Sequence, residues 1–221
     1  MKLWSRHIFE YLTSLSPPAD VPAGIAWLRP YDHPAVRSIL ELFLEKYFND
    51  SAYRTLILGI NPGRFGAGQT GINFTAPKQL KEYCGIEHPF KDSTELSAEF
   101  IYRIINQFGG PEQFYSRFIL GSVCPLGLVK NGKNLNYYDD EKLCSQVKPF
   151  IVSSISKMAA LHINDRCVCI GEKNFRYLSN LNSEFGWFKS IVTVPHPRFI
   201  MQYKRKELPA YVQLYLDVLK K

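Results

Sequence analysis

Four short apolar runs, each followed by a loop and then by a helical pattern, place the strongest constraint on the fold of this chain. The runs cover residues 53–60, 118–123, 166–170 and 191–194. Each is too short for a typical helix but suits a strand buried on both faces. A strand, a loop and a helix that recur four times predict a parallel sheet with helices on both sides. We therefore expect an α/β fold, a three-layer α/β/α sandwich with a central four-stranded, mostly parallel sheet.

The spacing of apolar residues outside these runs predicts the helices. Helices are expected over about 34–49, 95–108, 141–161 and 208–219, with another after Gly171, and residues 130–140 are expected to form a polar loop. A length of 221 residues and a hydrophobic content of 46% suit one sizeable core. We expect a single domain over residues 1–221, in which residues 1–50 form an N-terminal helical layer and residues 51–221 form the α/β core.

Residues that suit a binding site lie at the end of each predicted strand. They are Asn61, Ser122, Gly171 with Lys173, and His196. The carboxyl ends of parallel strands meet at one edge of the sheet, which is where ligands bind in open α/β folds. Taken singly, each feature is weak, because Asn before Pro-Gly is common in turns and a His between prolines is more commonly structural. Their joint placement predicts one shared site.

The basic composition fits a polyanionic partner without identifying it. Lys and Arg number 27 against 20 Asp and Glu, which gives a formal net charge of +7. Gly171 is a candidate phosphate contact because a helix N-terminus supplies free N–H groups. Basic candidates for phosphate contacts are Lys130, Lys133, Lys173, Lys204 and Arg205, although residues 204–206 could equally be a solvated charge run.

Other classes of protein are disfavoured by what the sequence lacks. It has no apolar run long enough to span a bilayer and no secretory signal at its N-terminus, so we expect a cytoplasmic protein without a membrane partner. We also expect a monomer. The five cysteines are scattered, and only Cys167 and Cys169 lie close together, which favours core packing over a disulfide or a metal site. We expect neither a metal ion nor another cofactor.

The segment LGINPGRFGAGQTGINF, residues 58–74, resembles the first motif of the single-strand-selective monofunctional uracil-DNA glycosylases, which reads GMNPGPFGMAQTGVPF. Residues 194–197 (VPHP) resemble the superfamily's second motif, a His-Pro sequence that begins a loop inserted into DNA. Residues 124–126 (CPL) and 133–135 (KNL) resemble further short motifs of that family. The resemblance is strongest to a bacterial branch with the ending His-Pro-Arg-Phe. It implies DNA as the partner and removal of uracil, or a related deaminated base, to leave an abasic site.

Three departures from that family pattern concern the choice of base. Ser122 and Val123 stand where vertebrate members have Asn-His, whose Asn reads the Watson-Crick edge of the flipped pyrimidine. A Ser hydroxyl cannot make the two-point contact of an amide. Ala67 replaces a Met and opens space, and residues 198–199 (Arg-Phe) replace Ser-Pro. These departures predict a base choice broader than uracil that could admit a deaminated purine.

The chemistry of N-glycosidic cleavage assigns the main roles. The reaction builds positive charge on the deoxyribose and negative charge on the departing base. Asn61 is suited to bind the water, because its amide both accepts and donates hydrogen bonds while staying neutral. His196 can donate a hydrogen bond to the base oxygen. Phe74 is the candidate for stacking on the flipped base. No Asp or Glu lies in the first motif, which excludes a carboxylate base acting from that loop and favours a dissociative route.

The remaining candidates line the base or contact DNA. The further base-binding candidates are Gly59, Gly63, Phe65 and Ser122. The DNA-binding candidates are Pro62, Lys133, Gly171, Lys173, Pro197, Arg198 and Phe199, which would contact phosphates or wedge into the base stack. Tyr137 and Tyr138 could stack on bases, but buried packing is the favoured use.

Two alternatives come from other functional classes. The first is a protein that binds damaged DNA on the same fold but has lost catalysis, a possibility that Ser122 raises. The second is a nucleotide- or phosphate-binding α/β enzyme. It is disfavoured because GINPGRFG has neither the Walker Lys-Ser/Thr nor the GxGxxG spacing of dinucleotide sites.

Overall fold

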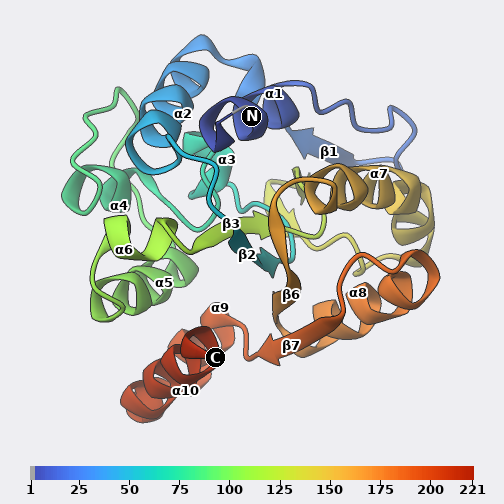
Figure 1. Ribbon diagram of the computed structural model, residues 1–221. Helices are drawn as coiled ribbons and strands as arrows, with labels where there is room; N and C mark the ends of the chain where they lie inside the picture. The colour runs from blue at the N-terminus through green and yellow to red at the C-terminus, as the bar shows by residue number, and fades with distance from the viewer. Residues whose placement is uncertain (1–2) are drawn as a thin grey trace.

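A four-stranded parallel sheet lies at the centre of the computed structural model, which describes residues 3–221 (Figure 1). Its strand order is β3-β2-β6-β7, and all neighbouring pairs are parallel. The strands are β2 (Arg54–Gly59), β3 (Phe118–Ser122), β6 (Ile163–Ile170) and β7 (Ser190–Val194). These are the four apolar runs of the sequence, with ends that differ by a few residues, and the predicted sheet is therefore confirmed.

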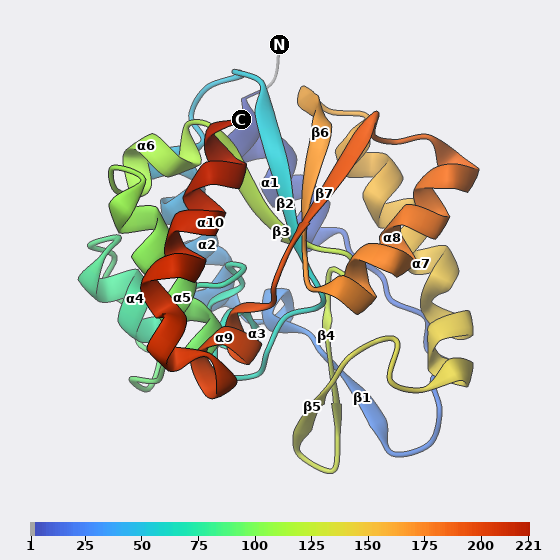
Figure 2. The ribbon, with the colours of Figure 1, turned by 90° about the horizontal axis from the view of Figure 1, so that it is seen from below.

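Helices cover both faces of this sheet, as the α/β/α prediction requires (Figure 2). Helices α7 (Glu141–Ala159) and α8 (Glu172–Phe185) lie on one side. The other side carries α2 (Pro34–Tyr47), α5 (Leu96–Gln107), α6 (Pro111–Tyr115) and α10 (Leu208–Lys220). Helix α1 (Trp4–Thr13) packs on α2. Short helical turns complete the chain: η1 (Pro30–Asp32), α3 (Ala67–Thr70), α4 (Pro77–Glu82), α9 (Pro197–Tyr203) and η2 (Arg205–Glu207).

Strand β2 is buried along its whole length, which fixes the starting point of the loop that follows it. At its first position, the fully buried Arg54 pairs with the carboxylate of Asp50 at 2.6 and 2.8 Å and donates to the Tyr115 carbonyl at 2.7 Å. A buried guanidinium is tolerated only when it is paired and hydrogen-bonded in this way. The start of β2 is thus anchored by a satisfied charge, and the rest of the strand by apolar packing.

A second, smaller sheet is an addition to the predicted architecture. It is antiparallel, has the order β1-β4-β5, and consists of β1 (Ile25–Leu28), β4 (Gly127–Lys130) and β5 (Lys133–Leu135). Strand β1 lies in the stretch expected to be helical, and β4 and β5 in part replace the expected polar loop. Asn131 and Gly132 join them with φ angles of 50° and 69°, as a tight two-residue hairpin turn requires. Figure 2 shows this sheet projecting beyond the carboxyl ends of β2 and β6.

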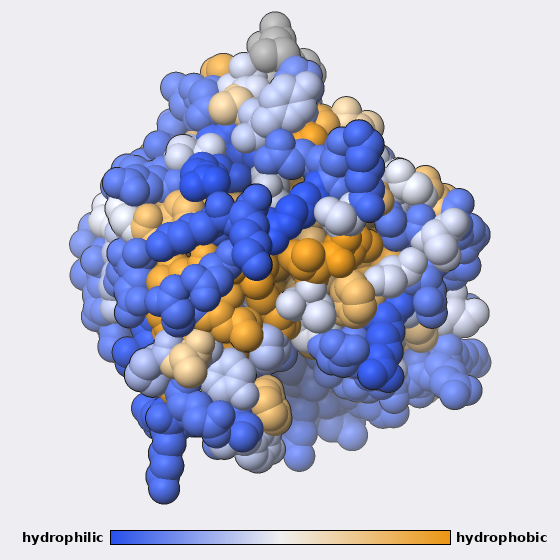
Figure 3. All heavy atoms as spheres, turned by 60° about the horizontal axis from the view of Figure 1, so that its bottom comes forward, coloured by the Kyte–Doolittle hydropathy of each residue, from blue (hydrophilic) through white to orange (hydrophobic). Residues whose placement is uncertain are grey.

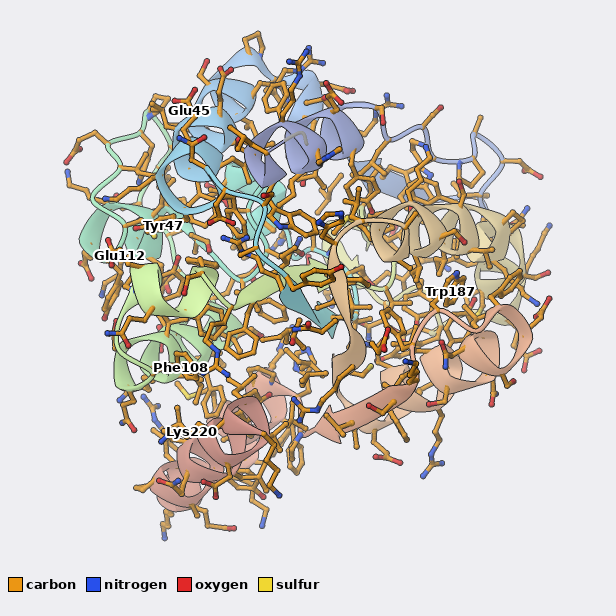
Figure 4. The ribbon with its side chains drawn as sticks, in the orientation of Figure 1. Glu45, Tyr47, Phe108, Glu112, Trp187 and Lys220 are labelled. Carbon is orange, nitrogen blue, oxygen red and sulfur yellow. The ribbon has the colours of Figure 1, made fainter. Side chains whose placement is uncertain are left out.

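The periphery is held by individual side-chain contacts. Trp187, which follows α8, donates from its indole nitrogen to the Ser156 hydroxyl of α7 at 2.9 Å and so joins the two helices on that face (Figure 4). On the side where β7 forms the edge of the sheet, a band of hydrophobic residues is bordered by hydrophilic ones (Figure 3). Among residues 3–221, no helix has the length and apolar character needed to cross a membrane.

Candidate active site

Asn61 lies just beyond the end of β2, and both ends of its side-chain amide are hydrogen-bonded. Its Nδ2 donates to the Leu135 carbonyl at 3.1 Å, and its Oδ1 accepts from the Tyr137 N–H at 3.2 Å. These bonds hold the amide in one orientation against the chain that leaves β5. One hydrogen on Nδ2 and one lone pair on Oδ1 remain for another ligand.

His196 follows β7 and caps α9, and its contacts determine its protonation. Its Nδ1 accepts a hydrogen bond from the Arg198 N–H at 3.1 Å. Burial, reinforced by the Arg198 charge, lowers the pKa of His196 from 6.5 to about 4. Because Nδ1 accepts, the proton of the neutral ring lies on Nε2. His196 is therefore a neutral imidazole near pH 7 that can donate one hydrogen bond from Nε2.

A buried asparagine on α8 connects β2, β6 and the chain after β5. Asn174 is fully buried, and its Nδ2 donates to the carbonyls of Gly59 at 3.0 Å and Ile170 at 3.3 Å. Its Oδ1 accepts from the Tyr137 hydroxyl at 2.8 Å. Since the N–H of Tyr137 bonds Asn61, Asn174 and Tyr137 together fix the backbone that orients the Asn61 amide.

Gly171 brings the end of β6 against His196. Its φ of 95° lies in the region that favours glycine, and a Cβ at this position would be 3.6 Å from the His196 Cβ. Its N–H is already used, because it donates to the Val194 carbonyl at 2.8 Å. Gly171 therefore packs beside the imidazole, while any phosphate contact at this helix end would have to come from the N–H groups that follow it.

Asn61 and His196 follow positions of β2 and β7 that are matched in the strand register. Leu58 is opposite Cys169, and Cys169 is opposite Thr193. Asn61 and His196 each lie three residues beyond the outer members of this row. The row spans two strand spacings, about 10 Å. The two predicted reactive side chains thus follow β2 and β7 on either side of the end of β6.

A third group of predicted residues gathers at the ends of β2 and β3. Gly59 is opposite Ser122 in the sheet. The Phe74 ring lies directly against Gly59, since a Cβ there would be 2.5 Å from Cζ of the ring. The Ser122 hydroxyl donates to Oδ1 of Asn73 at 2.7 Å. Gly59, Phe74 and Ser122 are therefore brought together, and Asn73 joins them.

Glu95 reaches this region from the start of α5. Its Oε1 accepts from the Phe65 N–H at 3.0 Å, and its carboxylate lies where side chains at Gly63 or Gly66 would otherwise be. Burial raises the pKa of Glu95, against the hydrogen bonds from Phe65 and Gly66 and the charge of Arg198. No carboxylate occurs within the first motif, but the fold supplies one from elsewhere in the chain.

Several predicted contact residues lie on the outside of the molecule. Arg198 and Phe199 are exposed on the first turn of α9, and Lys133 is exposed on β5. Phe65 is 44% exposed, and the Arg64 guanidinium lies 4.2 Å from the centre of its ring. Phe65 is thus available to a partner at the surface.

Other predicted contact residues are less accessible. Pro62 and Pro197 are buried. Lys173 is exposed, but its ammonium donates to the Tyr138 carbonyl at 3.1 Å and lies 4.5 Å from the centre of the Tyr138 ring. Lys204 donates to Glu207 at 3.0 Å, as expected of a solvated charge run. The roles given to these residues remain predictions.

Sequence reasoning missed four residues of this site: Asn73, Glu95, Tyr137 as a positioning group, and Asn174. The expected burial of Tyr137 is confirmed, because its side chain is fully buried. No local pattern marks the others, since each acts through a partner that is distant in the chain. Within residues 3–221, no three side chains of the metal-binding types cluster as a metal site would require.

Comparisons with known proteins identify a matching family and a similar solved structure. The sequence pattern of the uracil DNA glycosylase superfamily matches residues 45–220. The crystal structure of wild-type Pedobacter heparinus SMUG2 is similar to this protein, with 43% sequence identity and a TM-score of 0.96. The match covers 100% of this chain and 98% of the SMUG2 chain.

Two mammalian proteins match shorter segments. The single-strand selective monofunctional uracil DNA glycosylase of Bos taurus is 31% identical over 100 residues, which are 37% of this chain and 37% of that protein. The corresponding Rattus norvegicus protein is 28% identical over 124 residues, 42% of this chain and 45% of that protein. The matched segments therefore span less than half of each mammalian protein.

Proposed function

Because this chain belongs to the uracil DNA glycosylase superfamily, we propose that it is a monofunctional DNA glycosylase. It extrudes uracil or a related deaminated base from DNA and hydrolyses the N-glycosidic bond, leaving an abasic site without cutting the strand. The observation that carries this proposal is the pairing of a clamped neutral amide, Asn61, with a neutral imidazole, His196, three residues beyond matched positions of β2 and β7.

Asn61 holds the attacking water in this proposal. Its two backbone partners, at Leu135 and Tyr137, leave one donor and one acceptor free on the amide. A water bound there is oriented without being deprotonated, since an amide is not a base at any working pH. The route is therefore dissociative: the glycosidic bond breaks ahead of water attack, and DNA phosphates help to stabilise the cationic sugar.

His196 stabilises the departing base. The base leaves with the electron pair of the glycosidic bond, and negative charge gathers on its carbonyl oxygen. The Nε2–H of a neutral His196 donates a hydrogen bond to that oxygen, and a preorganised donor of this kind contributes about 3–4 kcal/mol to the transition state. The Arg198 N–H holds the ring in the required tautomer, so the donor is in place before the substrate arrives.

Phe74 and Glu95 position the substrate and the loop. The tip of the Phe74 ring lies against Gly59, and we assign the ring to stacking on the base. Glu95 accepts from Phe65 and packs beside Gly63, so we assign it a role in shaping the loop rather than in proton transfer. No step of this route calls for a metal ion or a cofactor.

DNA binding follows from the exposed groups around the same sheet edge. The +7 formal charge of the chain, together with exposed Arg198 and Lys133, supplies attraction for phosphates. Phe199 is 45% exposed on the first turn of α9 and suits insertion into the base stack. We propose that the protein acts on DNA as a monomer, in a single domain.

One observation favours a second candidate, a damaged-DNA-binding protein without catalysis. Both polar atoms of the Asn61 amide are already bonded to backbone groups. These two bonds also suit a structural clamp, in which case Asn61 holds the chain after β5 and no water. Tight binding to abasic DNA by purified protein that releases no base would identify this function.

The test measures base release directly. Wild-type protein and the Asn61→Ala and His196→Ala variants are incubated with uracil-containing single- and double-stranded oligonucleotides, and abasic sites are scored by alkaline cleavage. We expect release by the wild type and a large loss in both variants, with no strand cleavage before alkali treatment. Full activity in both variants would contradict this mechanism.

A further inference from the structure

Asn73 is a polar residue at the sheet edge with part of its side chain unused. It precedes Phe74, whose φ of 55° is rare for a residue other than glycine. The Ser122 hydroxyl donates to its Oδ1 at 2.7 Å. Within residues 3–221, its Nδ2 makes no hydrogen bond, and the side chain is half-buried rather than enclosed. The amide thus retains both Nδ2 hydrogens and one lone pair on Oδ1.

The backbone of this segment is fixed from the opposite side. The Asn73 carbonyl accepts from the Thr75 hydroxyl at 3.2 Å. The Thr70 hydroxyl donates to the Thr75 carbonyl at 2.6 Å and accepts from the Ile72 N–H at 3.1 Å. The amide of Asn73 is therefore carried by a rigid turn and held at its oxygen by a strand, which is the preorganisation that a recognition group needs.

The position of this amide matters because of its neighbours. Ser122 is opposite Gly59 in the sheet, and the tip of the Phe74 ring lies against Gly59. A base stacked on Phe74 would present its edge to groups at the ends of β2 and β3. Ser122 alone cannot make a two-point contact with that edge, whereas the amide that it holds can.

Deaminated bases share one hydrogen-bonding pattern at this edge. Uracil offers the O4 acceptor beside the N3–H donor, and hypoxanthine offers the O6 acceptor beside the N1–H donor. Cytosine and adenine offer the reverse pattern, an amino donor beside a bare ring nitrogen. An amide that presents Nδ2–H beside a free Oδ1 lone pair complements the first pattern and opposes the second.

We propose that Asn73, positioned by Ser122, reads the carbonyl and N–H edge of the extruded base. This inference rests on the proposed glycosylase function and extends it, since it names the substrate class as bases that carry a lactam edge, pyrimidine or purine. Asn73 occupies the position of the Pro before the last Phe in the family motif GMNPGPFGMAQTGVPF. Ser122 occupies the position of the Asn that vertebrate members have shortly before Cys-Pro-Leu. The recognition amide is thus supplied by the loop instead of the strand.

The test compares substrates as well as variants. Single-turnover rates are measured on oligonucleotides that carry uracil, hypoxanthine or 2-pyrimidinone, a uracil analogue that lacks both O4 and N3–H. Variants are Asn73→Ala, Asn73→Asp, Ser122→Ala and, as a matched control on the exposed face of α8, Asn180→Ala. Thermal unfolding of each variant reports its folding.

Asn73→Ala should lower the single-turnover rate on uracil and hypoxanthine by about 10- to 100-fold, the usual discrimination of a two-point base contact. It should barely change the rate on 2-pyrimidinone, so the uracil preference over that analogue collapses. Asn73→Asp keeps the size but cannot donate to O4 and should lose uracil release similarly. Ser122→Ala, which only frees the amide, should cost roughly 3- to 10-fold, and Asn180→Ala nothing.

The outcomes separate this inference from the function on which it rests. A wild-type protein that releases no base overturns both. An active wild type, with Asn73→Ala and Asn73→Asp retaining the wild-type preference for uracil over 2-pyrimidinone within twofold, overturns the assignment of Asn73 alone. A loss that is equal on all three substrates would also overturn it, because that result marks a structural role.

Discussion

The loop after β2 and the turn after β7 lie at the same edge of the sheet but are built in different ways. Groups of the loop are bonded inward: Asn61 to the chain after β5, the Phe65 N–H to Glu95, and Thr70 within the loop. The turn after β7 holds the His196 ring inward, through the Arg198 N–H, but leaves the side chains of Arg198 and Phe199 exposed. In both regions the groups proposed for chemistry are held by hydrogen bonds, whereas the side chains after β7 that are proposed for DNA contact are exposed and free to adapt to DNA.

The largest expected effect tests whether the immobilised part carries the chemistry. His196→Ala removes the oriented Nε2–H donor and should lower the single-turnover rate by about 100- to 1,000-fold. DNA affinity should change little, since His196 is not one of the exposed side chains proposed to contact DNA. His162→Ala, an exposed histidine beside Tyr53, is the control. Equal loss of affinity and rate would show that the two functions are not divided in this way.

Asn174→Ala should be the most destabilising substitution at the site. It leaves the buried Gly59 carbonyl and the Tyr137 hydroxyl without their partner, and an unsatisfied buried polar group costs about 1–3 kcal/mol. Urea unfolding should show a corresponding fall in the free energy of unfolding. Base release should fall too, because Tyr137 orients Asn61. A variant of wild-type stability would mean that this network does not hold the loop.

The pH dependence follows from the lowered pKa of His196. The folded protein protonates this ring only near pH 4, whereas the unfolded chain does so near 6.5. Protons therefore favour the unfolded chain between these values, and the contribution of His196 to stability falls as pH drops from about 6.5 to about 4. The cleavage rate should show no inflection near pH 6.5. NMR titration of the ring, identified by its absence in His196→Ala, measures the pKa directly.

A smaller effect is expected from the exposed part. Arg198→Ala should weaken binding to single-stranded DNA and reduce the slope of log K against log salt by about 0.7, the value of one phosphate contact. Fluorescence anisotropy at several salt concentrations gives the slope, and Lys206→Ala on the exposed η2 turn serves as the comparison. If Arg198→Ala abolishes cleavage at saturating protein, the Arg198 side chain takes part in the cleavage step and not only in DNA binding.

The smallest expected effect concerns Glu95. Glu95→Gln keeps an oxygen that accepts from the Phe65 N–H, so stability should change by less than about 1 kcal/mol and the cleavage rate by only a few-fold. Glu95→Ala removes the acceptor and should lower both the stability and the cleavage rate further than Glu95→Gln does. A large rate loss in Glu95→Gln at normal stability would identify the carboxylate as a participant in catalysis, contrary to the dissociative route.

Much of the fold could be predicted from local patterns. The strands are short apolar runs, and the helices between them show regular apolar spacing. These two patterns were enough to predict the parallel sheet and the helical layers on its faces. The β4–β5 hairpin was not predicted, although the sequence contains a signal for it. That signal is Asn131-Gly132, a pair that suits a tight turn between two strands. Strand β1 has only four residues, and its pairing with β4 depends on that hairpin.

The site was predicted less completely, for a physical reason. Asn61 and His196 follow strands that the sequence marks, so their approach could be inferred from the sheet alone. Glu95, Asn73 and Asn174 act through hydrogen bonds to residues 30 to 115 positions away in the chain. Such pairings depend on how helices and loops are placed in three dimensions, which the spacing of residue types does not encode.

The clamp on Asn61 also links two distant parts of the surface. The backbone that grips its amide, residues 135–137, is the direct continuation of the hairpin that carries Lys133. A displacement of that hairpin by a docked nucleic acid would be passed along rigid backbone to the amide. The return limb of the hairpin therefore serves both the surface that carries Lys133 and the amide at the sheet edge.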